Sequence, residues 1–316
     1  MKRRGVFCAV MATLCCAPGT AVADVNDWTQ QASPTTSDLW AVSCPTTDSC
    51  WAVGDAGTII STSDGGATWT QQASHTTKYL QGVSCPTALT CWAVGDVGTI
   101  LSTTDGGSTW TQQKSPLPDY YMLDVSCPTV TSCWAVGLAG RIITTRDAGL
   151  VWTQQASPAT QDLASVSCPT VTSCWAVGGS WGEIVATRDG GGVWARQTSP
   201  RALWLSGVSC PTAISCWAVG ADDIGVGTIL STSDAGLTWG RQRYTGSPLQ
   251  GASCPTAAFC WAVGFGGTIA STIDLGSTWT PQASPTTNRL DGVSCPTPAS
   301  CWAVGAGGTI VTNALR

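Results

Sequence analysis

Charged side chains are scarce in this sequence, and two residue types that often carry catalysis are nearly missing. Only 10% of the 316 residues are charged, His75 is the one histidine, and Glu183 is the one glutamate. The sequence therefore disfavours a nucleophile activated by a histidine base, and it disfavours a zinc site built on histidines. We expect no metal and no cofactor, and no residue stands out as catalytic.

Long apolar runs and helical periodicity are missing as well. No stretch reaches the roughly 20 apolar residues that a membrane helix needs, so we expect no membrane insertion. No segment repeats its apolar residues every three to four positions, which disfavours helical solenoids and leucine-rich repeats. The 36 glycines and 17 prolines instead favour short strands joined by turns.

Residues 1–23 have the three parts of a secretory signal peptide: a basic start, an apolar run and small residues at Ala21 and Ala23. We predict cleavage before Asp24, and we expect the product to be secreted or extracytoplasmic, at a cell surface or in a periplasm. Cleavage removes three of the 14 basic residues and leaves 11 against 19 acidic ones, a net charge of −8. Such a charge disfavours nucleic acid as a partner.

One unit recurs seven times through the rest of the chain. Its skeleton is L-x-x-V-S-C-P-T-x-x-x-C-W-A-V-G-x-x-G-T-I-x-x-T-x-D-x-G-x-T-W, as in residues 80–110, and the first cysteines of successive units lie 41 to 44 residues apart. Four short extended segments with tight turns at this period are typical of a propeller blade. We therefore predict an all-β fold in which residues 24–316 form a single seven-bladed β-propeller of four-stranded antiparallel blades.

The second unit defines the strands that we expect in each blade, namely residues 80–85, 91–95, 99–103 and 108–113. The last unit stops after its third strand. Residues 27–31 match residues 109–113, so the N-terminal segment is predicted to supply the missing fourth strand beside residues 309–312. This pairing would close the ring and remove an exposed sheet edge.

The 14 cysteines after residue 23 form seven C-x₅-C pairs, each around the turn between the first and second strands. Metal hooks have a different spacing, whereas an even number of cysteines in an exported chain indicates disulfides. Such positions face each other across a hairpin, so each bridge should lie within one blade. The predicted pairs are Cys44 with Cys50, Cys85 with Cys91, Cys127 with Cys133, Cys168 with Cys174, Cys210 with Cys216, Cys254 with Cys260, and Cys295 with Cys301.

A second signature, T-x-D-x-G-x-[TV]-W, occurs six times, first at Asp64 to Trp69 and last at Asp274 to Trp279. Together with the W-A-V-G and G-T-I segments it resembles the Asp-box (bacterial neuraminidase) repeat, and the whole pattern resembles the photosystem II assembly and stability factor family of propellers. More distantly it resembles sialidases. The resemblance implies a propeller in which the aspartate binds its own hairpin and the tryptophan packs against the neighbouring strand.

Positions at which the repeat varies are the candidates for a binding site. Five residues before the shared serine of each unit, where the innermost strand begins, the side chain changes from blade to blade, so these residues should ring one mouth of the central channel. Strand alternation points Trp40 the same way, and a turn in unit four adds Trp181 and Glu183, with Arg141 as a conceivable ion-pair partner. The candidate ligand-binding residues are Asp38, Trp40, Tyr79, Tyr121, Asp162, Trp181, Glu183, Trp204 and Arg289. A solvated loop with incidental aromatic residues is the alternative.

Three functions remain compatible with these patterns. The first, which we favour, is an exported non-enzymatic propeller, monomeric, that binds a protein or a carbohydrate through this mouth. The second is a divergent glycoside hydrolase or sialidase-like enzyme, which would need two carboxylates roughly 5 to 10 Å apart. The third is a structural cell-surface protein without a discrete ligand.

Overall fold

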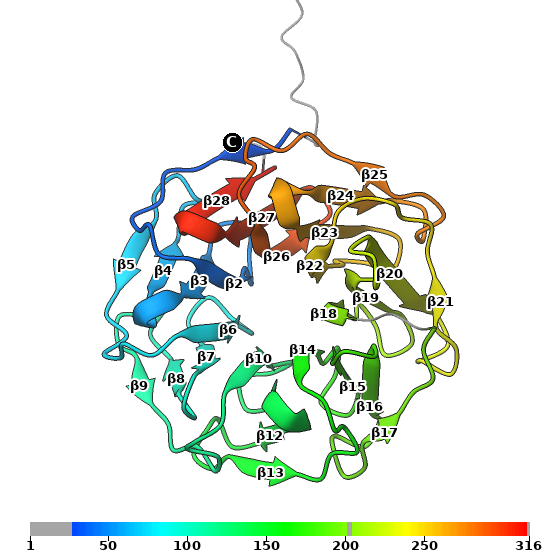
Figure 1. Ribbon diagram of the computed structural model, residues 1–316. Helices are drawn as coiled ribbons and strands as arrows, with labels where there is room; N and C mark the ends of the chain where they lie inside the picture. The colour runs from blue at the N-terminus through cyan, green and yellow to red at the C-terminus, as the bar shows by residue number, and fades with distance from the viewer. Residues whose placement is uncertain (1–26, 201–203, 315–316) are drawn as a thin grey trace, which may run out of the picture.

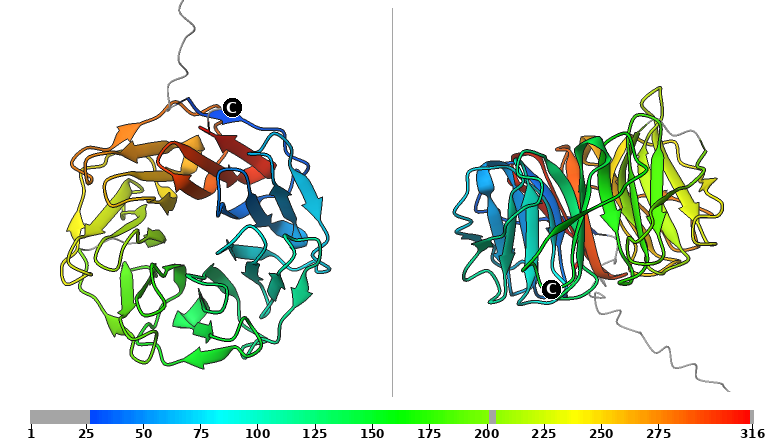
Figure 2. Two further views of the ribbon diagram at one scale, coloured as in Figure 1. Left: turned by 180° about the vertical axis from the view of Figure 1, so that it is seen from behind. Right: turned by 90° about the horizontal axis from the view of Figure 1, so that it is seen from below.

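The computed structural model describes residues 27–200 and 204–314 and arranges them as seven four-stranded antiparallel sheets around a central opening (Figure 1). The seven-bladed all-β propeller predicted from the repeat is confirmed. Seen from the side, the ring is a short, thick disc (Figure 2). The predicted signal peptide, residues 1–23, lies outside the described residues.

Each blade runs from the channel to the rim in chain order. Blade 1 consists of β2 to β5, blade 2 of β6 to β9, and so on to blade 7, in which β26, β27 and β28 are completed by β1. The innermost strands are β2 (Leu39–Ser43), β6 (Leu80–Ser84), β10 (Met122–Ser126), β14 (Leu163–Ser167), β18 (Trp204–Ser209), β22 (Leu249–Ser253) and β26 (Leu290–Thr297). The second strands are β3 (Cys50–Gly54), β7 (Cys91–Gly95), β11 (Cys133–Gly137), β15 (Cys174–Gly178), β19 (Cys216–Ala221), β23 (Cys260–Gly264) and β27 (Ser300–Gly305).

The outer half of each blade is shorter. The third strands are β4 (Ile59–Thr62), β8 (Ile100–Thr103), β12 (Ile142–Thr145), β16 (Glu183–Thr187), β20 (Gly227–Thr232), β24 (Ile269–Thr272) and β28 (Thr309–Thr312). The outermost strands are β5 (Thr70–Gln72), β9 (Thr111–Gln112), β13 (Thr153–Gln155), β17 (Ala195–Arg196), β21 (Gly240–Arg241), β25 (Thr280–Pro281) and β1 (Thr29–Gln30). Single 3₁₀ turns, η1 (Asp55–Gly57), η2 (Leu138–Gly140), η3 (Phe265–Gly267) and η4 (Ala306–Gly308), join second to third strands in four blades.

The fourth strands are shorter than the sequence predicted. In blade 2 the expected strand was residues 108–113, but β9 covers only two residues because the preceding ones belong to the Asp-box turn. There Thr109 donates its backbone N–H to Asp105 at 2.9 Å and its hydroxyl to the same carboxylate at 2.7 Å. These bonds hold the segment in a turn, so it cannot pair with β8.

The hydrophobic core is divided among the seven blade interfaces. Every W-A-V stretch of the second strands is buried, and its tryptophan and valine pack against the innermost strand of the next blade. Between blades 3 and 4, for example, Trp134, Val136 and Ile142 pack against Leu163 and Val166. The recurring tryptophans of the second strands, such as Trp217, are therefore core residues.

Serine side chains join the innermost strands of neighbouring blades. In all seven blades the hydroxyl of the shared serine accepts a hydrogen bond from the first cysteine of the next blade, at 2.9 to 3.0 Å. Ser43 binds the backbone N–H of Cys85, and Ser294 of blade 7 binds that of Cys44 in blade 1. The bonds thus run unbroken around the ring.

The cysteine pairs and Asp boxes both stabilise hairpins at the same end of the blades. All seven predicted disulfides are present within single blades, with Cα–Cα distances of 4.0 to 4.1 Å. In the first Asp box, Asp64 accepts bonds from Thr62 and Thr68, and these bonds lower its pKa to about 2. The Asp-box aspartates bind their own hairpins, as the resemblance implied.

The predicted closure by the N-terminal strand is also confirmed. Thr29 pairs with Thr312 and Gln30 with Val311, and the N–H of Gln31 reaches the carbonyl of Ile310 at 2.9 Å. In Figure 1 this N-terminal strand lies along β28 at the rim.

Removing the closing strand should destabilise the ring. We expect a mature protein lacking residues 24–33 to self-associate and to melt earlier, because the edge of β28 would be exposed. Size-exclusion chromatography and thermal melting measure both effects, and deletion of residues 24–26 alone is the control. A protein without residues 24–33 that stays monomeric and melts like the control contradicts the closure.

The serine ring predicts a second effect on stability. Replacing Ser167 by alanine leaves the N–H of Cys210 without its acceptor and should lower the free energy of unfolding by about 1 to 3 kcal/mol. The matched control is Ser63→Ala, at an exposed position of an Asp-box turn. Equal unfolding free energies for the two variants in urea titrations would show that the ring adds nothing.

Candidate functional site

The two faces of the disc carry different loops. The turns between second and third strands and the segments leading into the innermost strands lie on one face, here called the mouth face, which Figure 1 shows. The cysteine hairpins and the Asp-box turns lie on the opposite face, the hairpin face. The residues predicted to form a site all belong to the mouth face.

Exposed aromatic side chains gather on the mouth face. Five of the six exposed aromatic residues that the structure describes lie there, and only Phe259 is on the hairpin face. The mouth-face set is Tyr79, Tyr121, Trp181, Trp204 and Phe265, with exposed fractions of 47%, 39%, 68%, 51% and 43%. Tyr79, Tyr121 and Trp204 come from three different blades and stand at the start of the innermost strands, as the sequence predicted.

Three predicted residues meet at the seam between blades 7 and 1. The guanidinium of Arg289 lies over the ring of Trp40, 4.9 Å from its centroid, and its Nη2 is 3.6 Å from a carboxylate oxygen of Asp38. The indole N–H of Trp40 donates to Asp55 at 2.7 Å. Arg289 also donates through Nε to Asp291 at 2.7 Å. This cluster is charged, and Trp40 and Asp291 place it at the channel.

Two of the predicted carboxylates each accept a hydrogen bond from the preceding blade. Asp38 accepts the backbone N–H of Gly307 at 2.8 Å, and Asp162 accepts that of Ala139 at the same distance. Both donors are left-handed residues in the 3₁₀ turn of the preceding blade. These aspartates therefore tie neighbouring blades together at the mouth, which leaves fewer of their oxygens for a ligand.

Glu183 and Trp181 line a separate pocket of about 310 Å³ on blade 4. The conceivable pair of Glu183 with Arg141 is wrong. Glu183 binds Arg196 at 2.8 Å because that residue lies on β17, the strand next to its own, whereas Arg141 lies over the ring of Tyr120 at 4.8 Å. Oε2 of Glu183 also accepts the backbone N–H groups of Thr160 and Gln161, at 3.3 and 3.1 Å. No ring contact joins Trp181 to Trp204 in the described part of the chain.

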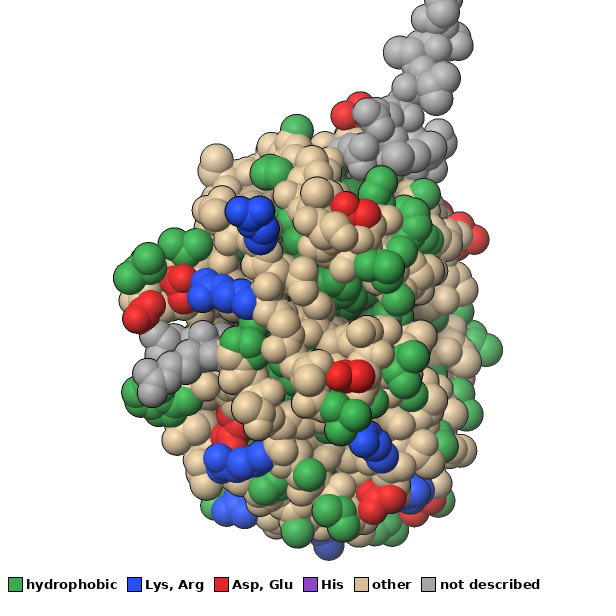
Figure 3. Space-filling view, turned by 90° about the vertical axis from the view of Figure 1, so that its right-hand side faces the viewer, with side chains coloured by type: hydrophobic (Ala, Val, Ile, Leu, Met, Phe, Trp, Pro, Cys, Tyr) green, Lys and Arg blue, Asp and Glu red, His purple; other side chains and the backbone are tan. Residues whose placement is uncertain are grey.

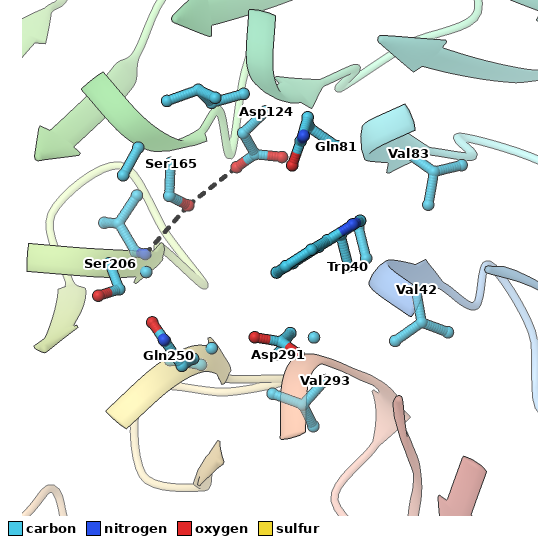
Figure 4. Close-up of a pocket in the computed structure, with 18 residues that line it drawn as sticks. Trp40, Val42, Gln81, Val83, Asp124, Ser165, Ser206, Gln250, Asp291 and Val293 are labelled. Atoms are coloured by element: carbon cyan, nitrogen blue, oxygen red, sulfur yellow. Dashed lines mark hydrogen bonds between the residues drawn. The ribbon is translucent and has the colours of Figure 1, made fainter. Parts of the chain in front are cut away.

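The central channel holds a cavity of about 170 Å³ that all seven innermost strands line (Figure 4). In every blade a β-bulge separates the first buried residue of the strand from the rest, as between Leu39 and Ala41. The bulged residue points into the channel. These residues are Trp40, Gln81, Leu123, Ala164, Ser206, Gln250 and Asp291.

Asp124 is a cavity residue that the sequence analysis missed. In other blades the equivalent position holds a small residue, because it touches the innermost strand of the next blade. In blade 2, for example, a Cβ on Gly82 would lie 2.7 Å from the Cα of Asp124. Asp124 instead reaches into blade 4, where its Oδ2 accepts the hydroxyl of Ser165 at 2.8 Å and the N–H of Val166 at 2.9 Å. Its burial raises its pKa to about 6, against the opposing effect of these bonds.

Asp291 is the second buried carboxylate of the channel. Only 7% of its side chain is exposed, and burial raises its pKa while the bond from Arg289 acts in the opposite direction. Its Oδ2 has no hydrogen-bond partner among the described residues. A search of the channel-facing positions of the repeat for polar side chains would have found Gln81, Asp124 and Asp291.

Metal and membrane features are not seen in the described chain. Residues 27–200 and 204–314 contain no group of three or more histidine, cysteine, aspartate or glutamate side chains arranged to hold a metal ion. No helix in these ranges is long and apolar enough to cross a membrane. Viewed from the rim, basic and acidic side chains are few and scattered, without a broad patch of either sign (Figure 3).

Comparison with known proteins supports the resemblance seen in the repeat. The family model for the photosynthesis system II assembly factor YCF48 matches residues 20–118. No curated protein matches the chain. The solved structure "YCF48 bound to D1 peptide" shares 21% identity with a TM-score of 0.73, covering 92% of this chain and 97% of its own.

Two other solved structures share the fold. YCF48 from Cyanidioschyzon merolae has 21% identity and a TM-score of 0.75, with 90% of this chain and 98% of its own covered. A streptogramin B lyase has 15% identity and a TM-score of 0.76, with 90% and 96% covered. The likeness in fold to YCF48 propellers is confirmed, and at these identities it concerns the fold alone.

The buried carboxylate of Asp124 predicts a pH effect on stability. Its folded pKa of about 6 lies above the ordinary value of 3.8, so the stability it contributes is complete below pH 3.8 and is lost as the pH rises through 6. We expect the free energy of unfolding to fall between pH 4 and pH 7.

Asp124→Ser is the matched variant for this measurement, because Ser165 already occupies the equivalent position and accepts the N–H of Val208. The fall should be reduced in Asp124→Ser when urea unfolding is compared at pH 4 and pH 7. An identical fall in the variant would assign the effect to other groups.

Proposed function

We propose that this chain is an exported, non-enzymatic propeller whose mouth face binds an extended segment of a partner protein. The concentration of exposed aromatic side chains around the mouth carries the proposal. Tyrosine and tryptophan supply large contact areas with few rotatable bonds, so ordering them costs little entropy. Binding sites on proteins are enriched in these residues.

The shape of the site favours a peptide over a folded domain. Tyr79, Tyr121 and Trp204 stand apart on different blades, so one occupant must cross the mouth to touch them all. An extended chain can do this while its side chains reach toward the channel. The solved YCF48 relative, described as bound to D1 peptide, supports the mode of binding through its common fold.

Export is part of the proposal. Seven intra-blade disulfides suit an oxidising compartment, and the predicted signal peptide precedes the described residues. Carbohydrate remains the alternative partner class, since exposed aromatic rings also stack on sugars. We expect the protein to act as a monomer.

The test begins with the oxidised mature protein on a peptide array and a glycan array in parallel. With a peptide hit in hand, Trp204→Ala should weaken its binding by about 2 kcal/mol, roughly 30-fold, and leave melting nearly unchanged. Trp204 is half exposed, and the equivalent position holds tyrosine, aspartate, proline or arginine in other blades. Calorimetric titration and thermal melting measure the two effects.

Trp217→Ala is the contrasting variant. Trp217 is only 4% exposed and packs edge-on against Trp279, with ring centroids 5.8 Å apart, so its removal should destabilise the fold by roughly 3 to 5 kcal/mol. Normal peptide binding by Trp204→Ala, or melting as early as that of Trp217→Ala, would exclude the mouth as the site. Hits on the glycan array alone would replace protein by carbohydrate as the partner.

A further inference from the structure

The pocket on blade 4 is built from side chains that depart from the repeat. Trp181 stands where other blades have alanine, valine or glycine, and Glu183 stands where five blades have threonine. Arg196 takes the place of a glutamine in the recurring outermost strand. All three line the pocket of about 310 Å³ at the mouth-face ends of β16 and β17. Because other blades fold without these side chains, the scaffold does not require them, and they point to a ligand.

The turn that carries Trp181 is fixed by hydrogen bonds. The N–H of Gly182 donates to the carbonyl of Gly179 at 3.4 Å, and the hydroxyl of Ser199 donates to the carbonyl of Gly182 at 2.9 Å. Both glycines have left-handed backbones, with φ of 69° and 66°, which glycine adopts without strain. The indole of Trp181 nevertheless stays 68% exposed. The turn therefore presents a flat apolar surface whose ordering costs little entropy.

The two charged side chains of the pocket neutralise each other. Nη2 of Arg196 lies 2.8 Å from Oε1 of Glu183, whose side chain is only 6% exposed. The other oxygen of Glu183 accepts the N–H groups of Thr160 and Gln161. No other described residue that lines the pocket is charged, so an ion of either sign gains little there. Glu183 is therefore a buried support that aligns Arg196 with the loop at residues 160–161.

Uncommitted hydrogen-bonding groups share the pocket with the indole. Nε and Nη2 of Arg196 bind the carbonyl of Pro158, and Nη2 also binds the hydroxyl of Thr160. Nη1 of Arg196 has no hydrogen-bond partner among the described residues, and half of the side chain is exposed. The Gln161 amide and the Thr198 hydroxyl are exposed groups that can each donate and accept. The pocket thus offers hydrogen bonds in both directions beside an apolar plane.

We propose that this pocket binds an uncharged pyranose sugar. The C–H groups on one face of such a ring pack against the electron-rich face of an indole, and its hydroxyls both donate and accept. The volume of about 310 Å³ lies at the lower end of the roughly 300 to 1,000 Å³ usual for small-molecule sites, which suits one or two sugar rings. The site goes beyond the proposed function, because it needs no peptide at the mouth.

The first experiment titrates three uncharged disaccharides, lactose, cellobiose and maltose, into the oxidised mature protein with ¹⁵N-labelled tryptophan. We expect the indole resonance of Trp181, identified by its loss in Trp181→Ala, to shift saturably with at least one of them. Stacking should also shift the C–H protons of that sugar upfield. Because the pocket has no net charge, the affinity should be equal at low and at high sodium chloride.

Trp181→Ala should weaken binding of that disaccharide at least tenfold, since loss of an aromatic anchor from a binding hot spot typically costs this much or more. Melting should stay nearly unchanged, because alanine stands at the equivalent position in blades 1 and 3. Phe259→Ala is the control. It removes an exposed aromatic ring from the hairpin face and should bind the disaccharide like the unaltered protein.

A double variant tests the polar side of the pocket. Glu183→Thr combined with Arg196→Gln restores the residues that blade 2 has at these positions, Thr99 and Gln112, and leaves no buried charge unpaired. The variant should fold, which thermal melting checks. It should bind the disaccharide at least tenfold more weakly, because the hydrogen bonds donated by a charged guanidinium are lost.

Three results would each overturn the sugar site: no saturable shift with any of the disaccharides, an affinity that falls with salt, or equal losses in Phe259→Ala and Trp181→Ala. A mouth-binding peptide that loses affinity in Trp181→Ala, while no sugar binds, would assign the pocket to the peptide. That result overturns the sugar site and leaves the proposed function standing. Sugar binding without any peptide binding supports the sugar site and contradicts the proposed function.

Discussion

The fold depends on how neighbouring blades are joined at the channel. Innermost strands of adjacent blades do not pair as sheets, so their backbone groups must find partners by other means. The ring of seven serine hydroxyls meets this need, each accepting the N–H of the first cysteine in the next blade. Because every blade donates once and accepts once, the arrangement is complete only when the ring is closed.

Because of this constraint, the repeat sequence is nearly constant at the hairpin face and varies at the mouth face. The serine ring, the disulfides and the Asp boxes all act near the hairpin face, where the repeat barely changes. At the mouth the blades are joined by individual contacts, such as Asp38 with Gly307 at one seam and Asp162 with Ala139 at another. Substitutions at the mouth should therefore destabilise the fold less than substitutions at the hairpins. The exposed aromatic residues lie at these more tolerant positions.

The sequence predicted the scaffold well because each device recurs. Blade number, strand order, disulfide pairing and closure by β1 follow from a period and a missing strand. The length of the outer strands was overestimated because the Asp-box bonds compete with pairing. The site was harder to predict: the partner of Glu183 depends on which strand is adjacent, and Arg196 takes the place of a glutamine in the recurring outermost strand.

The channel residues other than Trp40 escaped prediction for a geometric reason. Simple alternation assigns one side of the innermost strand to the channel, but the bulge turns an extra residue inward and shifts the assignment beyond it. Asp124 lies just past that bulge, at a position where four blades have glycine. Ser165, the equivalent residue of blade 4, supplies one hydrogen-bond acceptor to the innermost strand of the next blade. A carboxylate at this position supplies the same acceptor but adds one negative charge. Burial of that charge raises the pKa of Asp124 to about 6, so protonation at lower pH removes the excess.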